Sequence, residues 1–295
     1  MGPFLNVLLP ILIISGIGYL FSYFKKIELK TLADIVIYIS TPALVFTVLA
    51  RQDFNFQEYT LIAASAFFVI LGTGLIILSA AKTFKWRLSP SFYLPSMFMN
   101  TAFIGYPVVY FALGTAGLSK APLYDMVNGF LMFSLGIFIL SPKSDKLRFL
   151  KIPFIYAALL GLIISGFDLK VPGLIMHPLD LLAAATIPLA LFMLGYKLSE
   201  IRVNAKLLGF SLYSTFFRII VGFLLALAFV KVFRLGPVPA AVVVLMSIMP
   251  AAINNIALSE EFEGETELIA CAIAASTILG IFTIPLALYL INILI

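Results

Sequence analysis

The chain is built from ten apolar runs separated by short loops, and each run is close to the length that crosses a bilayer. About 20 apolar helical residues span the hydrocarbon core, where the backbone must satisfy its own hydrogen bonds. Only 11% of the residues are charged, against about 25% in soluble domains. We therefore predict an all-α polytopic membrane protein with ten transmembrane helices. The runs lie at roughly 4–24, 31–50, 58–81, 90–112, 121–141, 152–167, 178–198, 205–232, 239–259 and 268–292.

Lys and Arg residues in the loops predict the orientation of these helices. Basic residues collect in cytoplasmic loops, whereas acidic residues contribute little to orientation. The loops after runs 1, 3, 5 and 7 are basic, with Lys25, Lys26, Lys30, Lys82, Lys85, Arg87, Lys143, Lys146, Arg148, Lys151, Lys197, Arg202 and Lys206. The opposite side holds only Arg51, Lys120, Lys170, Lys231 and Arg234. We expect a multi-pass protein of the plasma (inner) membrane with both termini extracytoplasmic.

Ten runs divide into two sets of five around a basic linker. We predict a first five-helix repeat at 1–141, a cytoplasmic linker at 142–151 and a second repeat at 152–295. Because each half has an odd number of spans, the second half enters from the opposite side, which makes an inverted repeat. Proline spacing agrees, since Pro42 and Pro188 are 146 residues apart and Pro107 and Pro250 are 143 apart.

The fourth and ninth runs are interrupted, as expected for a transporter site. Asn100-Thr-Ala-Phe-Ile-Gly-Tyr-Pro107 and Met249-Pro-Ala-Ala-Ile-Asn-Asn255 place proline and amides inside apolar stretches. Proline frees backbone carbonyls, and interruptions at matching places in two halves indicate a transporter's binding site. Half-helix N-termini suit an anionic group. The candidate substrate contacts here are Asn100, Thr101, Tyr106, Asn254 and Asn255; alternatively, the amides only complete the broken backbone.

The second and seventh runs are similar to each other. Ser40-Thr-Pro-Ala-Leu-Val-Phe46 and Ile187-Pro-Leu-Ala-Leu-Phe192 both place proline before an apolar stretch that ends in Phe. The hydroxyls of Ser40 and Thr41 are candidate substrate contacts, although membrane-helix hydroxyls commonly bond their own preceding carbonyls. Pro42 and Pro188 are expected to have structural roles.

Arg218 lies near the centre of the eighth run, where an arginine is costly and is usually functional or paired. It could neutralise a substrate carboxylate, bond the exposed carbonyls of a broken helix, or extend toward the interface. The interpretation favoured here is pairing with carbonyls. Asp34 and Asp125 lie near the ends of their runs and are interpreted as solvated caps, and His177 as a surface residue in an outer loop.

Several classes of protein are disfavoured by missing patterns. The sequence has no Gly-Lys-Ser/Thr phosphate loop for ATP-driven pumping and too few His and Cys residues for a His/Cys zinc site. No catalytic motif of an intramembrane enzyme is present, and the central runs hold no pair of carboxylates of the sodium–proton antiporter type. The clustered loop positions of the basic residues do not suggest nucleic-acid binding. We predict no enzyme activity, no metal and no cofactor.

Five stretches make the chain resemble the auxin efflux carrier family, which includes plant PIN-type carriers and bacterial relatives. They are Thr41-Pro-Ala-Leu-Val-Phe46, Asn100-Thr-Ala-Phe-Ile-Gly-Tyr-Pro107, Ile187-Pro-Leu-Ala-Leu-Phe-Met-Leu-Gly195, Met249-Pro-Ala-Ala-Ile-Asn-Asn-Ile-Ala-Leu258 and Ser276-Thr-Ile-Leu-Gly-Ile-Phe-Thr-Ile-Pro285. The resemblance implies two inverted five-helix repeats, crossover helices 4 and 9 at the substrate site, and a homodimer. It also implies organic-anion substrates such as auxin-like weak acids or dicarboxylates. The short linker indicates a compact, prokaryotic-type member.

The leading hypothesis is a secondary transporter that moves an organic anion by alternating access. Spans 1, 2, 6 and 7 would form a scaffold, and spans 3–5 and 8–10 would carry the crossover site, a division that the resemblance implies. A sodium-coupled carboxylate or bile-acid-like symporter is the alternative within transport, and coupling to Na⁺ or H⁺ stays open. A ligand-sensing membrane protein without transport is the alternative from another class.

Overall fold

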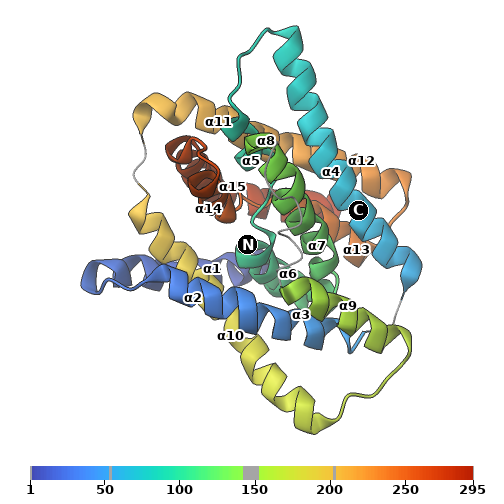
Figure 1. Ribbon diagram of the computed structural model, residues 1–295. Helices are drawn as coiled ribbons and strands as arrows, with labels where there is room; N and C mark the ends of the chain where they lie inside the picture. Colours follow the sequence, from blue (N-terminus) through green and yellow to red (C-terminus); the bar gives the residue numbers. More distant parts are fainter. Residues whose placement is uncertain (1, 53–54, 142–152, 202–203, 295) are drawn as a thin grey trace.

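The computed structural model describes residues 2–52, 55–141, 153–201 and 204–294, and all of its named elements are helices joined by short loops (Figure 1). In the first half the helices are α1 (Gly2–Phe24), α2 (Leu29–Ile35), the π-helix η1 (Val36–Ser40), α3 (Thr41–Leu49), α4 (Phe56–Thr83), α5 (Pro90–Met97), the π-helix η2 (Thr101–Gly105), α6 (Tyr106–Leu118), α7 (Ala121–Leu131), the π-helix η3 (Met132–Gly136) and α8 (Ile137–Leu140). The predicted linker 142–151 lies outside the described residues.

In the second half the helices are α9 (Pro153–Gly166), α10 (Gly173–Glu200), the 3₁₀ turn η5 (Ala205–Leu207), α11 (Leu208–Phe216), the π-helix η6 (Phe217–Val221), α12 (Gly222–Val232), α13 (Pro237–Ser247), α14 (Asn254–Glu261) and α15 (Thr266–Leu294). His177 is exposed but lies inside α10, so the expected outer loop there is wrong.

Eight described helices or helix runs are long and apolar enough to cross a membrane. They correspond to the expected spans 1–5, 7, 8 and 10, although only the Thr101–Leu118 part of span 4 qualifies. The expected spans 6 and 9 appear as the shorter apolar helices Pro153–Gly166 and Pro237–Ser247. The protein is therefore a multi-pass membrane protein.

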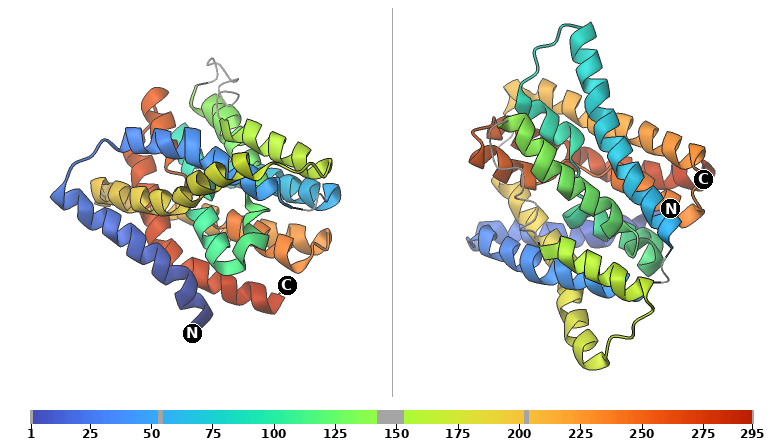
Figure 2. Two further views of the ribbon diagram at one scale, coloured as in Figure 1. Left: turned by 90° about the horizontal axis from the view of Figure 1, so that it is seen from below. Right: turned by 45° about the vertical axis from the view of Figure 1, so that its right-hand side comes forward.

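The helices pack as two bundles. In the first bundle α1 lies along α10, and α3 packs against α9 and α10. In the second bundle α4 contacts α5, α7, α12 and α13, while α15 contacts α5, α11, α13 and α14. The first bundle occupies the lower part of Figure 1, and Figure 2 shows the start of α1 and the end of α15 on the same side of the molecule.

Close backbone contact holds the first bundle together. A Cβ atom added to Gly18 of α1 would overlap the carbonyl group of Phe192, and one added to Gly195 of α10 would overlap the carbonyl group of Ser15. Two helices can approach this closely only where a side chain is missing from each facing position. Glycine at these two positions therefore allows α1 and α10 to pack with their backbones in close contact.

Wide π turns precede two of the prolines. Pro42 and Pro107 are the second residues of α3 and α6, directly after η1 and η2. Proline has no N–H and its ring crowds the carbonyl of the preceding turn, and a π turn relieves both constraints without ending the helix. Pro188 lies inside the continuous α10. Pro42, Pro107 and Pro188 therefore modify helices rather than interrupt them.

Candidate functional site

Two helices of the second bundle are interrupted, and their interruptions pair with each other. Helix α5 ends at Met97 and η2 begins at Thr101. Helix α13 ends at Ser247 and α14 begins at Asn254. Met99 and Ala251 form an isolated antiparallel bridge. We call this pair of interrupted helices the crossover.

Main-chain hydrogen bonds close the crossover. The N–H of Asn100 donates to the carbonyl of Pro250 at 2.8 Å, and the N–H of Ala252 donates to the carbonyl of Phe98 at 3.0 Å. Unpaired backbone groups are expensive in hydrocarbon, so each extended segment satisfies the other. The first interruption lies at Phe98–Asn100, at the start of the Asn100–Pro107 stretch that the sequence singled out, whereas Pro107 itself lies within helix α6.

Side chains from neighbouring helices complete the pairing. Asn128 of α7 accepts from the N–H of Met99 at 3.2 Å through Oδ1 and donates to the carbonyl of Met99 at 2.8 Å through Nδ2. On the other segment the N–H of Ala251 donates to Ser276 Oγ of α15 at 3.1 Å. Asn128 therefore holds Met99 as a neighbouring β-strand would.

Arg218 joins the ends of the two interrupted helices. It is fully buried, and its guanidinium donates to the carbonyl of Met97, the last residue of α5. It also donates to the carbonyl of Ser247, the last residue of α13, at 2.6 Å. The π-helix η6 positions the side chain. These carbonyls carry the negative ends of two helix dipoles, so one cation serves both helix ends.

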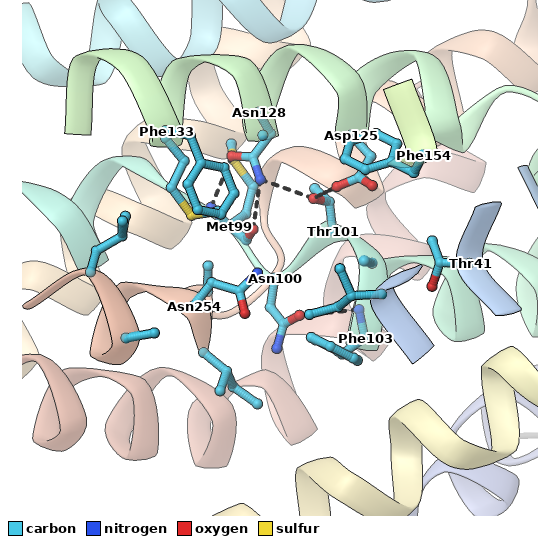
Figure 3. Close-up of a pocket in the computed structure, with 18 of the residues that line it drawn as sticks. Thr41, Met99, Asn100, Thr101, Phe103, Asp125, Asn128, Phe133, Phe154 and Asn254 are labelled. Atoms are coloured by element: carbon cyan, nitrogen blue, oxygen red, sulfur yellow. Dashed lines mark hydrogen bonds between the residues drawn. The ribbon is translucent and has the colours of Figure 1, made fainter. Parts of the chain in front are cut away.

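A cavity of about 320 Å³, which we call the inner cavity, lies beside the crossover, where the two bundles meet (Figure 3). The first bundle lines it with α2, η1, α3 and α9, and the second with η2, α7, η3 and α14. Its polar lining residues are Asp34, Tyr38, Thr41, Asn100, Thr101, Asp125, Asn128, Asn254 and Glu261. A wider cavity of about 650 Å³ adjoins it and is lined by Lys30, Lys197 and Glu260 among others. Asp34, Asn254 and Glu261 line both cavities.

Three of the predicted substrate contacts at the crossover meet in the inner cavity: Asn100, Thr101 and Asn254. Asn100 caps η2, because its Oδ1 accepts from the N–H of Phe103 at 3.1 Å. Its Nδ2 is buried and has no hydrogen-bond partner among the described residues. The amide therefore holds the helix start with its oxygen and keeps a donor available.

Of the other four predicted substrate contacts, one lines the inner cavity and three do not. Thr41 lines the cavity, whereas Ser40 does not, and its Oγ donates to the carbonyl of Val36 at 3.4 Å. Tyr106 is buried behind the cavity wall. Asn255 is also buried outside the lining, and neither polar atom of its side chain has a partner in the described chain.

Asp125 and Asn128 are the site residues that the sequence analysis missed. The prediction that Asp125 is a solvated cap is wrong, because the residue is 6% exposed. It accepts hydrogen bonds from Thr101 Oγ1 and, at 2.7 Å, from the Tyr106 hydroxyl. The available signal was their spacing: Asp125 and Asn128 are three residues apart and so share a helix face, in a run with no other charged residue.

The charge of the inner cavity is negative. Its lining contains the carboxylates of Asp34, Asp125 and Glu261, and no Lys, Arg or His belongs to it in the part of the chain that the structure describes. Asp34 and Glu261 are exposed, so water screens them, whereas Asp125 is buried. The wall can therefore attract an anion only through uncharged donors and helix N-termini.

A crossover of two interrupted helices beside a polar cavity within a multi-pass helical protein is the arrangement expected of a membrane transporter. The sequence comparisons agree, because residues 3–152 and 142–288 match the membrane transport protein family. The chain belongs to this family, and the resemblance to auxin efflux carriers is confirmed.

Two archaeal proteins are similar to the chain over nearly its whole length. An uncharacterized transporter of Methanocaldococcus jannaschii is 28% identical over 303 residues, which cover 96% of this chain and 97% of the relative. An uncharacterized transporter of Methanothermobacter thermautotrophicus is 28% identical over 299 residues, which cover 95% and 96%.

Proposed function

We propose that this protein is a carrier of organic anions such as carboxylates, with its substrate site in the inner cavity. The observation that carries the proposal is the cluster of Asn100, Thr101 and Asn254 at two helix starts. The first N–H groups of a helix have no partner within the helix and lie at its positive end. Helix η2–α6 begins at Thr101 and α14 begins at Asn254, and both residues line the cavity.

The two helix starts and the unpaired amide donor of Asn100 would together bind a carboxylate group. A carboxylate placed between them would accept hydrogen bonds from Asn100 Nδ2, from Asn254 and from the backbone N–H groups of Thr101 and Ala102, since the N–H groups of Phe103, Asn255 and Ile256 already have partners. Such bonds to a charged group contribute about 1.5–3 kcal/mol each. The apolar lining, which includes Met132, Phe133 and Phe154, would contact the carbon skeleton.

The division into two bundles supports the proposal of alternating access. The first bundle takes the first two spans of each half, α1 and α2–α3 with α9 and α10, and the second bundle takes the remaining three of each. This symmetric division supports two inverted five-helix repeats. The substrate site lies between the bundles, so movement of one bundle against the other would expose the site on each side in turn. The first bundle is also the expected contact in a homodimer.

The wider cavity, which adjoins the inner one, is lined by Lys30 and Lys197. Both belong to the set of basic residues whose distribution predicts the cytoplasmic side, and they lie at the start of α2 and in the last turn of α10. We infer that the structure is an inward-facing state of a plasma-membrane carrier whose termini are both extracytoplasmic.

Substitution of the amides tests the site. Asn100→Ala and Asn254→Ala should each weaken binding of a transported carboxylate about tenfold to hundredfold, because each loses a hydrogen bond to a charge. Asn100→Ser separates the two roles of Asn100: serine is an equally good N-cap but lacks the amide donor. It should preserve melting temperature and still lose affinity.

The assay is thermal shift of the purified protein against a panel of mono- and dicarboxylates, followed by uptake into proteoliposomes. The control is Asn6→Ala, which removes an exposed amide on α1 far from the cavity lining. Normal binding and uptake by both Asn100→Ser and Asn254→Ala would show that the amides serve only the backbone.

A further inference from the structure

Asp125 is a buried carboxylate that the proposed anion site does not use. Its two partners, Thr101 and Tyr106, are hydroxyl side chains on the helix that begins at the crossover. Thr101 and Asp125 line the inner cavity together with Asn100 (Figure 3). The Asp125 carboxylate is therefore hydrogen-bonded to the half-helix whose start is proposed to bind substrate.

A negative Asp125 opposes an anion in this cavity. Two like charges repel far more strongly in a protein interior than in water, because the effective dielectric constant falls several-fold. The cavity volume of about 320 Å³ leaves little room to separate a bound carboxylate from the Asp125 wall. The described lining contains no Lys or Arg, and the buried Arg218, which contacts the lining residue Met99, is already bonded to the carbonyls of Met97 and Ser247. A proton on Asp125 would remove the repulsion.

We propose that Asp125 is the proton-binding residue of this carrier and that it takes up one proton when the anion binds. The inference rests on the proposed function and names its coupling ion. In the step itself, a hydronium ion gives a proton to the Asp125 carboxylate: one O–H bond of the hydronium breaks, one O–H bond forms on Asp125, and a water molecule is left. The same proton returns to water on the far side when the anion leaves.

The hydrogen bonds indicate which oxygen receives the proton. Asn128 Nδ2 donates to Thr101 Oγ1 at 3.0 Å, so the Thr101 hydroxyl is oriented to donate to Asp125 Oδ1. The Tyr106 hydroxyl, which bonds Oδ2 at 2.7 Å, has no such constraint. A hydroxyl both donates and accepts, so rotation of the Tyr106 hydroxyl lets it accept from a protonated Oδ2. Both charge states of Asp125 are thus satisfied.

Asp125 lines the inner cavity, where the substrate is proposed to bind, and not the wider cavity beside it. Asp34 and Glu261 line both cavities, whereas Asp125 and Thr41 line only the inner one. Thr41 lies seven residues beyond Asp34, about 10 Å further along the helix at 1.5 Å per residue. Asp125, like Thr41, therefore lies outside the part of the inner cavity that is shared with the wider one.

Other titratable groups surround Asp125 at greater distance or in other partnerships. Across the cavity lie Asp34, Tyr38 and Glu261. At the start of α7, Lys120 is paired with Glu58 of α4 at 2.6 Å. The remaining groups on α7 and on the elements packed against it are Tyr59, Lys82, Tyr106, Tyr110, Tyr124 and Tyr156, and α13 contributes none. Of these groups, Tyr106 is the one that hydrogen-bonds to Asp125 in the described part of the chain.

The first test reads the proton without any substrate. Infrared difference spectra of the purified protein between acidic and alkaline pH should show the band of a buried protonated carboxyl group. Asp125→Asn should lack that band. Asp34→Asn, the same change at an exposed carboxylate of the same cavity, should retain it.

The second test uses L-malate, a carboxylate that does not cross lipid by itself. Wild-type malate affinity should fall about tenfold per pH unit once Asp125 loses its proton, because one proton is linked to binding. In proteoliposomes malate entry should carry protons inward, as read by an internal pH dye. Asparagine mimics the protonated acid, so Asp125→Asn should bind malate independently of pH and exchange it without proton movement. Asp34→Asn should keep the pH dependence.

The outcomes separate the coupling from the carrier function. Malate transport without proton movement, or with affinity that follows Na⁺ rather than pH, would overturn the assignment of Asp125 and leave the anion carrier standing. Absence of the carboxyl band in the wild type would do the same. If the band is present and neither malate nor any carboxylate of the panel is transported, the carrier function fails and the coupling fails with it.

Discussion

Replacing Arg218 with Gln is the sharpest test of how the crossover is held together. The guanidinium donates to the last carbonyl of α5 and the last carbonyl of α13 from a fully buried position. Glutamine has a shorter side chain and no charge, so it reaches at most one of the two carbonyls. The change leaves at least one helix end without a donor inside the protein.

The expected loss of stability follows from these contacts. Hydrogen bonds to a charged group are worth about 1.5–3 kcal/mol each, and a buried acceptor left unpaired is expensive at low dielectric. The substitution also removes the desolvation penalty of the buried charge, which offsets part of this loss. We expect a net loss of roughly 3 kcal/mol, which corresponds to a fall in melting temperature on the order of 5–10 °C.

The assay is the melting temperature of the purified protein in detergent, without ligand. The matched control is Arg51→Gln, because Arg51 makes a two-bond contact with Asp180 at 2.7 and 2.8 Å but its side chain is 50% exposed. Exposed ion pairs contribute about 0–1 kcal/mol, so this variant should melt within a few degrees of the wild type. Arg218→Lys, which keeps the charge on one nitrogen, should fall between the two.

The result that would refute the reasoning is specific. An Arg218→Gln protein with the melting temperature of the wild type and strongly weakened carboxylate binding would show that the charge meets the substrate. The carbonyl contacts would then be incidental to stability.

Two further predictions concern packing and topology. A Cβ on Gly222 would lie 2.7 Å from the carbonyl oxygen of Ser247 and 2.8 Å from Arg218 Nη2, so Gly222→Ala should cost roughly 1–3 kcal/mol by overpacking. Gly209→Ala in the same helical run meets nothing within 4 Å and should be neutral or slightly stabilising; equal melting temperatures would contradict the contact. For topology, Lys146→Cys, which lies outside the described residues, should resist an impermeant thiol reagent in intact cells and react after permeabilisation, against a low background because Cys271 is buried. Labelling from outside would reverse the predicted orientation.

The membrane-spanning helices could be predicted from the sequence because hydropathy is a local property of each segment. The same holds for the interruption at Ile248–Ile253, where Pro250 lies in the break itself. The candidates Asn100, Thr101, Thr41 and Asn254 also line the cavity. These residues are polar groups in apolar segments, and such groups require a cavity or a partner wherever the fold places them.

The position of the first interruption was decided by tertiary structure. Pro107 predicts a break at its own position, yet a π turn absorbs the proline, and the chain leaves the helix at Phe98–Asn100 instead. It does so because Pro250 and Ala252 of the other half, with Asn128 of α7, supply hydrogen bonds to that segment. No local pattern contains those partners.

Asp125 shows the same limit. Its place near the start of a helical run predicts a solvated cap, and only the packing of the second half-helix over α7 buries it between Thr101 and Tyr106. A carboxylate's environment depends on which helices lie over it, and residues 19 and 24 positions earlier in the chain supply its partners. The sequence by itself determined the polar residues available to the site, and the tertiary structure decided which of them became the buried, hydrogen-bonded acid.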